Sequence, residues 1–584
     1  MEPVEDNKSN QEDNYSGNMY SYHQEEQNPP IGEGGAIRRS LGEENPNLPE
    51  GRAIRRSLGE ENPNVPEGGA IRRSLGEENP NVPEGGAIRR SLGEANPNAP
   101  SPYQYQNSSY NNDRAIGQNS IIIHVDQSPP LYWMFFLIFG IIQVVFIIFL
   151  ANYYNWDEYN KPSFIENNEK AKTIINQKYK YFQDINIMIF LGFGFLRSFL
   201  KHHSWTSIAL TLMGGVLSFE FGLFTLICWS SIMRKSWYPG KFNFQHLLDS
   251  NYCAAATVIS LGALFGKLSF AQYFVMILAE TIFSTLNYIL LRQVLKIVDI
   301  GGAITVHLFG AVFGGIFSLV SFVHKNERER IRLSPHLGTN YNSNIFALFG
   351  TLILISYWPS FNTALVEGNQ KYRGIINTYL SIGGSIIGTF IISPICNMRK
   401  FKINHILNST FAGGIIVAGC CNIINEFYLC IVFGFSAGIL STILFFLLSD
   451  RLTQKGFHDT SGIIYYHGIP GFLGGIVSTI FVGNLFRFDN VDIKDVIGKI
   501  LDYDLQSGER KFSIIAGIHF GSIFLTIFIA ACSGLVAGFI IKFCNCNIAI
   551  RYFNDSEFFD SSDIEPFPWD DEEVELKVHY DSKA

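Results

Sequence analysis

The chain is poor in charge for its length. Charged residues make up 16% of its 584 residues, against about 25% in soluble domains. Residues 1–129 carry a net charge of −9 and residues 547–584 carry −8. Because the whole chain carries −8, residues 130–546 carry +9. Two acidic ends therefore flank an apolar, slightly basic centre. This distribution excludes a soluble multidomain enzyme, a wholly disordered chain and a nucleic-acid binder driven by net charge, and it indicates a polytopic membrane protein.

Cysteine is also scarce. The 9 cysteines all lie at or beyond Cys228 and show no spacing typical of a zinc site or a disulfide framework. A nucleotide-binding loop is missing too, since residues 262–267 fall one residue short of the Walker A spacing and lie in an apolar run. No nucleophile, base and acid occur together in a pattern that predicts catalysis. We therefore expect no enzyme activity, no cofactor and no metal site.

The first 129 residues contain no apolar stretch long enough for a signal peptide or a membrane span. Residues 33–100 hold four tandem copies of a 17-residue unit that reads EGGAIRRSLGEENPNVP with small changes. The units could form a multivalent array for an unknown partner. Their low apolar content instead favours a disordered cytosolic extension. By the same reasoning residues 547–584 form an acidic cytosolic tail, with a docking peptide around Phe567 as the alternative.

Twelve stretches between residues 130 and 546 are apolar and long enough to be candidate spans. They are Leu131–Tyr153, Asp184–Leu200, Ser207–Ile232, Asn251–Gly266, Phe270–Leu291, Ile300–Val323, Asn344–Leu365, Gly374–Cys396, Lys402–Cys421, Glu426–Leu448, Gly462–Val482 and Ser513–Cys544. An even number places both termini on one side. The short loops on that side are richer in Lys and Arg, which predicts cytosolic termini. The chain is thus predicted to be an all-α, multi-pass protein of the plasma membrane or an internal membrane.

Two of these spans begin with the same pattern, D-x-x-G-x-x-x-x-H. The first copy runs from Asp299 to His307 and the second from Asp459 to His467. The copies lie five spans apart, so they cross the bilayer in opposite directions. This predicts an inverted repeat of five spans each, with the two histidines meeting between the halves.

A histidine at membrane depth faces an interior or a cavity, because exposing it to lipid is costly. Two facing imidazoles can share a proton and offer donors and acceptors along a narrow path. A cation there would pay a desolvation penalty that a small neutral solute would not. His307 and His467 are therefore predicted to line a path for a neutral hydrogen-bonding molecule or a proton, rather than only to tie two helices together.

Four of the acidic residues at or within spans are assigned a role here. Asp299 and Asp459 stand where each copy of the pattern begins, and both are interpreted mainly as caps of free backbone N–H groups. Asp299 could in addition stabilise a cation outside the path. Glu220 and Glu280 lie inside spans and are interpreted as helix–helix contacts, with a second polar path as the alternative.

Five stretches of the sequence resemble the Rh glycoproteins, the Rh branch of the ammonium transporter superfamily. They are IVDIGGAITVHLFGAVFGG around His307, and Tyr181–Lys201, Ser250–Ser269, Tyr357–Ala364 and His458–Gly475. The resemblance extends in order from about Leu131 to Cys544, so it covers the membrane channel domain, residues 130–546. It does not cover the repeats or the acidic tail.

This resemblance implies an ammonium-transporter-like fold and a homotrimer with one pore in each subunit, conducting ammonia or methylammonium taken up as ammonium. It implies that His307 and His467 line the pore and that Asp299 is the buried acid below its mouth. It also implies that Tyr252 and Phe361 are the outer and inner gate rings, with Asn362 directly after the inner ring.

Two positions depart from the family pattern. Tyr252 stands where the family has Phe, and Tyr288 where it often has an acid that draws cations to the mouth. Two other functions stay open from the sequence. One is a non-conducting Rh-like membrane scaffold, against which the presence of both histidines argues. The other is a channel for carbon dioxide or another small neutral solute.

Overall fold

The computed structural model describes most of the apolar centre of the chain. The described residues are 130–156, 169–235, 240–242, 244–321, 338–366, 368–484 and 512–543, together with Asp555 and Phe559. The predicted extension 1–129, its repeats and all other residues of the acidic tail lie outside this part.

The described residues form a helical bundle. Its first half consists of α1 (Pro130–Tyr153), α3 (Glu169–Asn186), η5 (Ile187–Phe193), α4 (Gly194–Leu196), η6 (Arg197–Phe199), α5 (Ser204–Arg234), α6 (Phe244–Leu261), α7 (Phe270–Ile289), η7 (Leu290–Val294), η8 (Ala303–Leu308) and α8 (Phe309–Ser321). Its second half consists of α10 (Tyr341–Thr363), α11 (Asn369–Cys396), α12 (Ile403–Asn408), η10 (Ser409–Phe411), α13 (Ala412–Ile416), α14 (Phe427–Gln454), η11 (Ile464–Gly468), α15 (Ile469–Gly483) and α17 (Phe512–Phe543).

All twelve predicted spans coincide with helical segments, which confirms the all-α, multi-pass fold. Eight of the described helices are long and apolar enough to cross a membrane. The structure adds two details to this prediction. The ninth span is broken into α12, η10 and α13, and two strands occur outside the spans, where β1 (Tyr154–Trp156) pairs in parallel with β2 (Gly240–Phe242).

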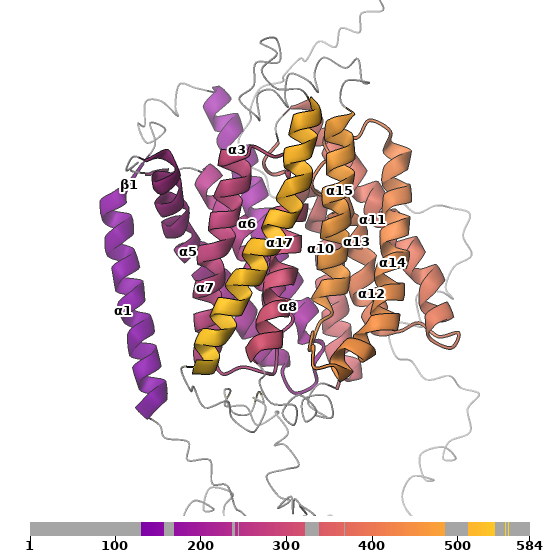
Figure 1. Cartoon of the computed structure of the whole chain (residues 1–584), viewed down its shortest axis with the longest axis horizontal. Helices are drawn as coiled ribbons and strands as arrows, with labels where there is room; N and C mark the ends of the chain where they lie inside the picture. Colours follow the sequence, from indigo (N-terminus) through magenta and orange to yellow (C-terminus); the bar gives the residue numbers. More distant parts are fainter. Residues whose placement is uncertain are drawn as a thin grey trace, which may run out of the picture. The chain divides into compact units, whose positions relative to one another are not determined.

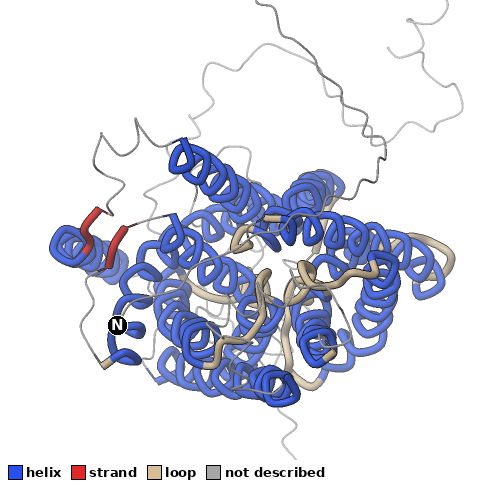
Figure 2. The backbone as a smooth tube through the Cα atoms, turned by 90° about the horizontal axis from the view of Figure 1, so that it is seen from above, coloured by secondary structure: helices blue, strands red, loops and turns tan. Residues whose placement is uncertain are grey.

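The first and last helices lie on the outside of the bundle (Figure 1). Helix α1 stands at one edge and contacts α5, where Gln143 Nε2 donates to Glu220 Oε2 at 2.9 Å. Helix α17 crosses the bundle obliquely and packs on α7, α8 and α15. Seen from above, α1 lies beside the two short strands, away from the centre (Figure 2). The Glu220 contact is the helix–helix contact expected from the sequence.

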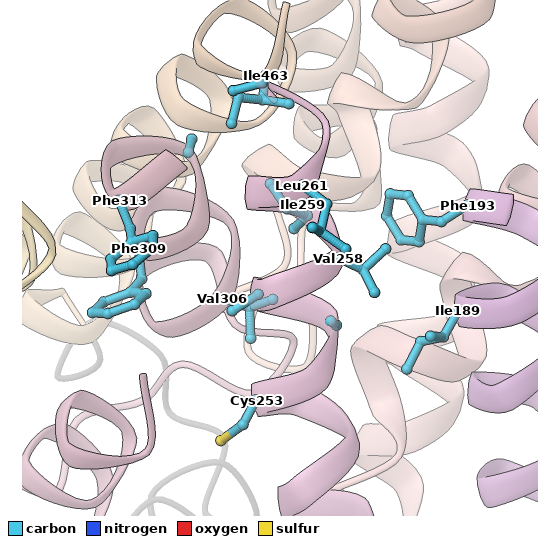
Figure 3. Close-up of a cluster of buried hydrophobic side chains, with 14 of the residues drawn as sticks. Ile189, Phe193, Cys253, Val258, Ile259, Leu261, Val306, Phe309, Phe313 and Ile463 are labelled. Atoms are coloured by element: carbon cyan, nitrogen blue, oxygen red, sulfur yellow. The ribbon is translucent and has the colours of Figure 1, made fainter. Parts of the chain in front are cut away.

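Helix α6 lies at the centre of the first half. Every residue from Ser250 to Leu261 is buried. Figure 3 shows side chains of α6 packed among the rings of Phe309 and Phe313 from α8 and Phe193 from η5. Ser260 of this helix donates to the buried Glu280 carboxylate on α7 at 2.5 Å. The second acidic residue inside a span is thus also a helix–helix contact.

Small residues let helices of the second half approach closely. A Cβ placed on Gly434 of α14 would lie 1.8 Å from the backbone oxygen of Ser381 on α11, and one on Gly384 would lie 2.3 Å from that of Ile431. Only glycine fits such contacts, because the helix backbones touch directly. The packing of α11 on α14 has a counterpart five spans earlier, where α5 packs on α7. This pairing agrees with the predicted repeat of five spans.

Candidate functional site

The two copies of the D-x-x-G-x-x-x-x-H pattern adopt the same local structure. Gly302 has φ +71° and Gly462 has φ +74°, in the left-handed region that favours glycine. Each glycine is followed within two residues by a short π-helix, η8 or η11, which carries the histidine of its copy. The left-handed turn and the wide π-turn together direct each imidazole into the bundle, since single π-turns re-aim side chains at functional sites.

The two histidines meet in the interior. The Nδ1 atoms of His307 and His467 lie 3.3 Å apart, and their rings are stacked at 5.4 Å between centroids with 20° between planes. Both side chains are buried. The structure thus brings together the pair that the sequence predicts to be adjacent.

The contact between the two Nδ1 atoms fixes what the pair can offer a solute. One Nδ1 must carry a proton and donate a hydrogen bond, and the other Nδ1 must accept that bond. A neutral imidazole has one donor and one acceptor nitrogen, so one Nε2 is then an acceptor and the other a donor. The Nε2 atom of His307 is buried and has no hydrogen-bond partner among the described residues. The pair therefore presents complementary groups to a small molecule that both donates and accepts hydrogen bonds.

Aromatic rings continue from the histidines toward one end of the bundle. The ring of Tyr252 on α6 stacks on that of Phe361 on α10, with 4.6 Å between centroids and 25° between planes. The Tyr252 hydroxyl donates to the Phe361 backbone oxygen. The Phe361 ring lies 6.0 Å from the His307 ring. The two rings implied as gates are hence stacked directly beside the histidine pair.

Three more rings surround the histidines. Trp358 of α10 stacks on His307 at 5.6 Å, while Phe411 of η10 and Phe193 of η5 lie 5.4 Å and 6.0 Å from His467. We call the two histidines and their aromatic neighbours the aromatic–histidine column; it consists of Tyr252, Phe361, Trp358, His307, His467, Phe411 and Phe193. All seven side chains are buried, so the column is a dry, apolar environment interrupted by two imidazoles.

Asp299 caps the first copy of the pattern. Its carboxylate accepts the backbone N–H groups of Ile304 at 3.2 Å and Thr305 at 2.8 Å, and the Thr305 hydroxyl at 2.8 Å. Arg292 Nη1 donates to the backbone oxygen of Asp299 at 3.0 Å. These neutral donors satisfy a fully buried carboxylate, which is the capping arrangement expected from the sequence.

Asp459 caps the second copy in the same way but in a different electrostatic setting. Its carboxylate accepts the N–H groups of Ile463 and Ile464, each at 2.9 Å. The charges of Lys267 and Arg197 also act on it. One cationic side chain, Arg292, thus lies near Asp299, whereas two lie near Asp459.

Asn362 and Tyr288 lie beside the column rather than in it. The Asn362 amide donates to Thr378 Oγ1 at 3.1 Å and to the backbone oxygen of Gly414 at 2.9 Å, so it joins helices. The Tyr288 hydroxyl donates to Asp249 at 2.7 Å. Asp249 lies one turn before Tyr252 on α6, so an acid lies next to Tyr288 although Tyr288 itself is not acidic.

Several residues of the site were not predicted individually from the sequence. Trp358, Phe411 and Phe193 are aromatic residues in apolar segments, where nothing in the sequence separates a core ring from one beside a histidine. Arg197 did carry a signal, because a charged side chain inside a predicted span normally marks a functional interior position.

The fold and site together define a multi-pass helical membrane protein with a buried histidine pair inside a column of aromatic rings. The pattern described as Ammonium Transporter Family matches residues 159–557. The chain is 31% identical over 436 residues to Ammonium transporter Rh type C of Xenopus laevis, covering 71% of this chain and 88% of that protein. It is 30% identical to Ammonium transporter Rh type B of Oryzias latipes, covering 69% and 87%. The chain therefore belongs to the ammonium transporter family, in its Rh-type branch.

Solved structures show the same fold. Rh50 of Nitrosomonas europaea, from work on conduction by the Rhesus protein family of channels, superposes with a TM-score of 0.56 at 24% identity, covering 68% of this chain and 95% of that chain. Mep2 of Saccharomyces cerevisiae superposes with a TM-score of 0.50 at 14% identity, covering 67% and 89%. The membrane domain is thus an integral, multi-pass domain of this fold.

Proposed function

We propose that this protein conducts ammonia, taken up as ammonium, and also methylammonium, through a pore in each subunit that follows the aromatic–histidine column. Family membership supports ammonium transport or conduction in general. The observation that carries the finer proposal is the buried contact between His307 and His467, with an unpartnered His307 Nε2 atom.

The column suits a neutral solute. An aromatic face attracts a cation by only about 0.5–2 kcal/mol, whereas the desolvation penalty of an ion in such surroundings is several kcal/mol. Ammonia both donates and accepts hydrogen bonds, so it matches the donor and acceptor that the histidine pair presents. Ammonium would release its proton to water outside the Tyr252–Phe361 end of the column, and the ammonia would take up a proton from water beyond His467. In this proposal the stacked Tyr252 and Phe361 rings are the gate, which opens for passage.

The remaining elements follow from the same proposal. The protein is a homotrimer with cytosolic termini, located in the plasma membrane or an internal membrane. Asp299 and Asp459 keep the two histidines in position through the caps described above. Asn362 holds helix α10, which carries Phe361, against neighbouring helices through its hydrogen bonds. The extension 1–129 and the tail 547–584 are cytosolic segments outside the channel domain.

The experiment is an ammonia-driven change of internal pH in proteoliposomes, followed by stopped flow. It compares the wild type with a variant carrying both His307→Ala and His467→Ala. The matched control is His405→Ala, because His405 is equally buried but bonds to Ser393 away from the column. We expect faster alkalinisation with the wild type and the control than in empty liposomes, and a changed rate only with the double variant.

Three results would contradict the proposal. Folded wild-type protein that gives no faster alkalinisation than empty liposomes would favour the non-conducting scaffold. A wild type that accelerates acidification by carbon dioxide, but not alkalinisation by ammonia, would favour a channel for another neutral solute. An unchanged rate in the double variant would place the conducting path outside the histidine pair.

A further inference from the structure

One buried cation in the bundle is not explained by the caps or by the aromatic–histidine column. Arg197 begins η6 and its side chain is 1% exposed. Its Nε and Nη2 atoms are buried and have no hydrogen-bond partner among the described residues. A Cβ on Gly262, just after α6, would lie 1.8 Å from Arg197 Nη1. The absence of a side chain at Gly262 is therefore what leaves room for the guanidinium.

This guanidinium lies at the end of the column opposite Tyr252 and Phe361. Its central carbon is 5.8 Å from the ring centroid of Phe193 and 5.9 Å from that of Phe265. The Phe193 ring in turn lies 6.0 Å from the ring of His467, and the charge of Arg197 acts electrostatically on His467. One aromatic ring thus separates a fixed positive charge from the second histidine.

Two further ionisable side chains lie near Arg197 among the described residues. Lys267 is 3% exposed, and its ammonium donates to the backbone oxygen of Ala263 at 2.7 Å. Asp459 is the acid whose charge acts on both cations. Its oxygens are already bonded to the N–H groups of η11 and of the residue before it. Asp459 is thus held by its own cap, and Arg197 is the cation whose charge acts on His467 at the inner end of the column.

The first copy of the pattern has no such arrangement. Arg292, the cation near Asp299, is partly exposed and bonds to a backbone oxygen while it lies over the ring of Tyr288. Asp249 and Asp299 both act on Arg292 electrostatically, so this cation faces two acids. The cations at the two ends of the column therefore differ in burial and in hydrogen bonding.

We propose that Arg197 determines the charge selectivity of the pore, by opposing the passage of any cation past His467 while leaving neutral ammonia free to pass. A fixed positive charge in a narrow, apolar passage is a barrier to cations and not to neutral solutes. Because the side chain is buried, water screens its charge little. This inference rests on the proposed function and adds to it the residue that excludes ammonium at the inner end.

The test measures neutral and charged transport in the same proteoliposomes. Internal pH reports ammonia uptake, and charge displacement on a solid-supported membrane after an ammonium jump reports ion movement. The variants are Arg197→Met, which removes the charge at similar length, and Arg197→Lys, which keeps it. Arg451→Met is the matched control, because Arg451 is exposed at the end of α14.

We expect the ratio of charge moved to ammonia moved to rise in Arg197→Met by roughly tenfold, which is the size expected for a unit charge about 10 Å away at an effective dielectric constant of about 20. Arg197→Lys and Arg451→Met should keep the wild-type ratio. A purely structural Arg197 would change the amount of folded protein or both rates together, but not their ratio.

Each outcome decides between the proposals. An unchanged ratio in folded Arg197→Met, with a conducting wild type, would overturn the selectivity role and leave the proposed function standing. A wild type without ammonia uptake would overturn both. If Arg197→Met does not fold, Arg197→Gln replaces it, since an amide removes the charge and keeps two polar atoms. A ratio for Arg197→Gln equal to that of the wild type would then overturn the selectivity role.

Discussion

The two copies of the histidine-bearing pattern differ in what binds their aspartates. Both use a left-handed glycine, a short π-helix and a capping carboxylate to place an imidazole in the interior. Asp299 is satisfied by two N–H groups and a hydroxyl, all neutral. Asp459 is bound by two N–H groups and also balances part of the charge of Arg197 and Lys267. A repeated backbone can thus be kept while the electrostatics of its two ends diverge.

The largest expected difference between the copies concerns the charge of the aspartate. Asp459→Asn should lower the free energy of unfolding by about 3 kcal/mol, because removing one partner leaves buried cations uncompensated. Asp299→Asn should cost less, about 1–2 kcal/mol, because the carboxylate is bonded to neutral donors and the cation near it, Arg292, is partly exposed and also faces Asp249. Thermal unfolding of the two variants in detergent checks this order.

A double variant sharpens the same comparison. Adding Arg197→Met to Asp459→Asn should restore part of the lost stability, because one of the two uncompensated charges is then gone. Adding it to Asp299→Asn should give additive losses. A coupling energy near zero between Arg197→Met and Asp459→Asn would show that Arg197 and Asp459 do not interact.

The next effect tests what the copies share. Gly302→Ala and Gly462→Ala should each cost about 2 kcal/mol, because an L side chain is strained in the left-handed region. In addition, the new Cβ would lie 2.4 Å from Val306 in the first copy and 2.6 Å from Tyr466 in the second. Similar drops in melting temperature are expected, and Gly140→Ala, where no atom lies within 4 Å of the new Cβ, is the control. A large loss in one copy alone would show that the turns are not equivalent.

A smaller effect concerns the end of the column away from Arg197. Tyr252→Phe removes the hydroxyl that donates to the Phe361 backbone oxygen but keeps the stacked ring. Since such a hydrogen bond contributes about 1 kcal/mol, the rings should separate more easily and ammonia uptake should rise by about fivefold in stopped flow. An unchanged rate would mean that opening of this ring pair does not limit conduction.

The sequence predicted the features that depend on local pattern. Hydropathy located twelve helical segments, and the matched spacing of His307 and His467 predicted that the two residues meet. Features that depend on packing between distant segments were missed. The break of the ninth span at η10 places Phe411 beside His467, and no periodicity signals it. Similarly, the surroundings of Arg197 depend on a space left by Gly262, two spans later in the chain.

A third aspartate, Asp555, caps a helix that lies far from it in the sequence. Its removal should have the smallest effect of the variants considered. Helix α5 begins at Ser204, and His203 before it makes no side-chain cap. Asp555 supplies the cap from beyond the last span. Its carboxylate accepts the N–H of Trp205 at 3.0 Å, and the N–H and hydroxyl of Thr206 at 2.7 Å and 2.6 Å.

Because a helix cap contributes about 1 kcal/mol, Asp555→Ala should detach this contact without unfolding the bundle. Hydrogen exchange of the Trp205 and Thr206 amides should then accelerate by about fivefold, since both amides lose their acceptor. Asp555→Asn should keep slow exchange, because Asn caps helices about as well as Asp.

Accelerated exchange along the whole of α5 would mean that Asp555 stabilises the bundle itself. Unchanged exchange at the two amides would mean that another group caps α5. Exchange confined to these amides would show that a cap supplied from a distant segment, unlike the caps of Asp299 and Asp459, can be released while the site stays intact.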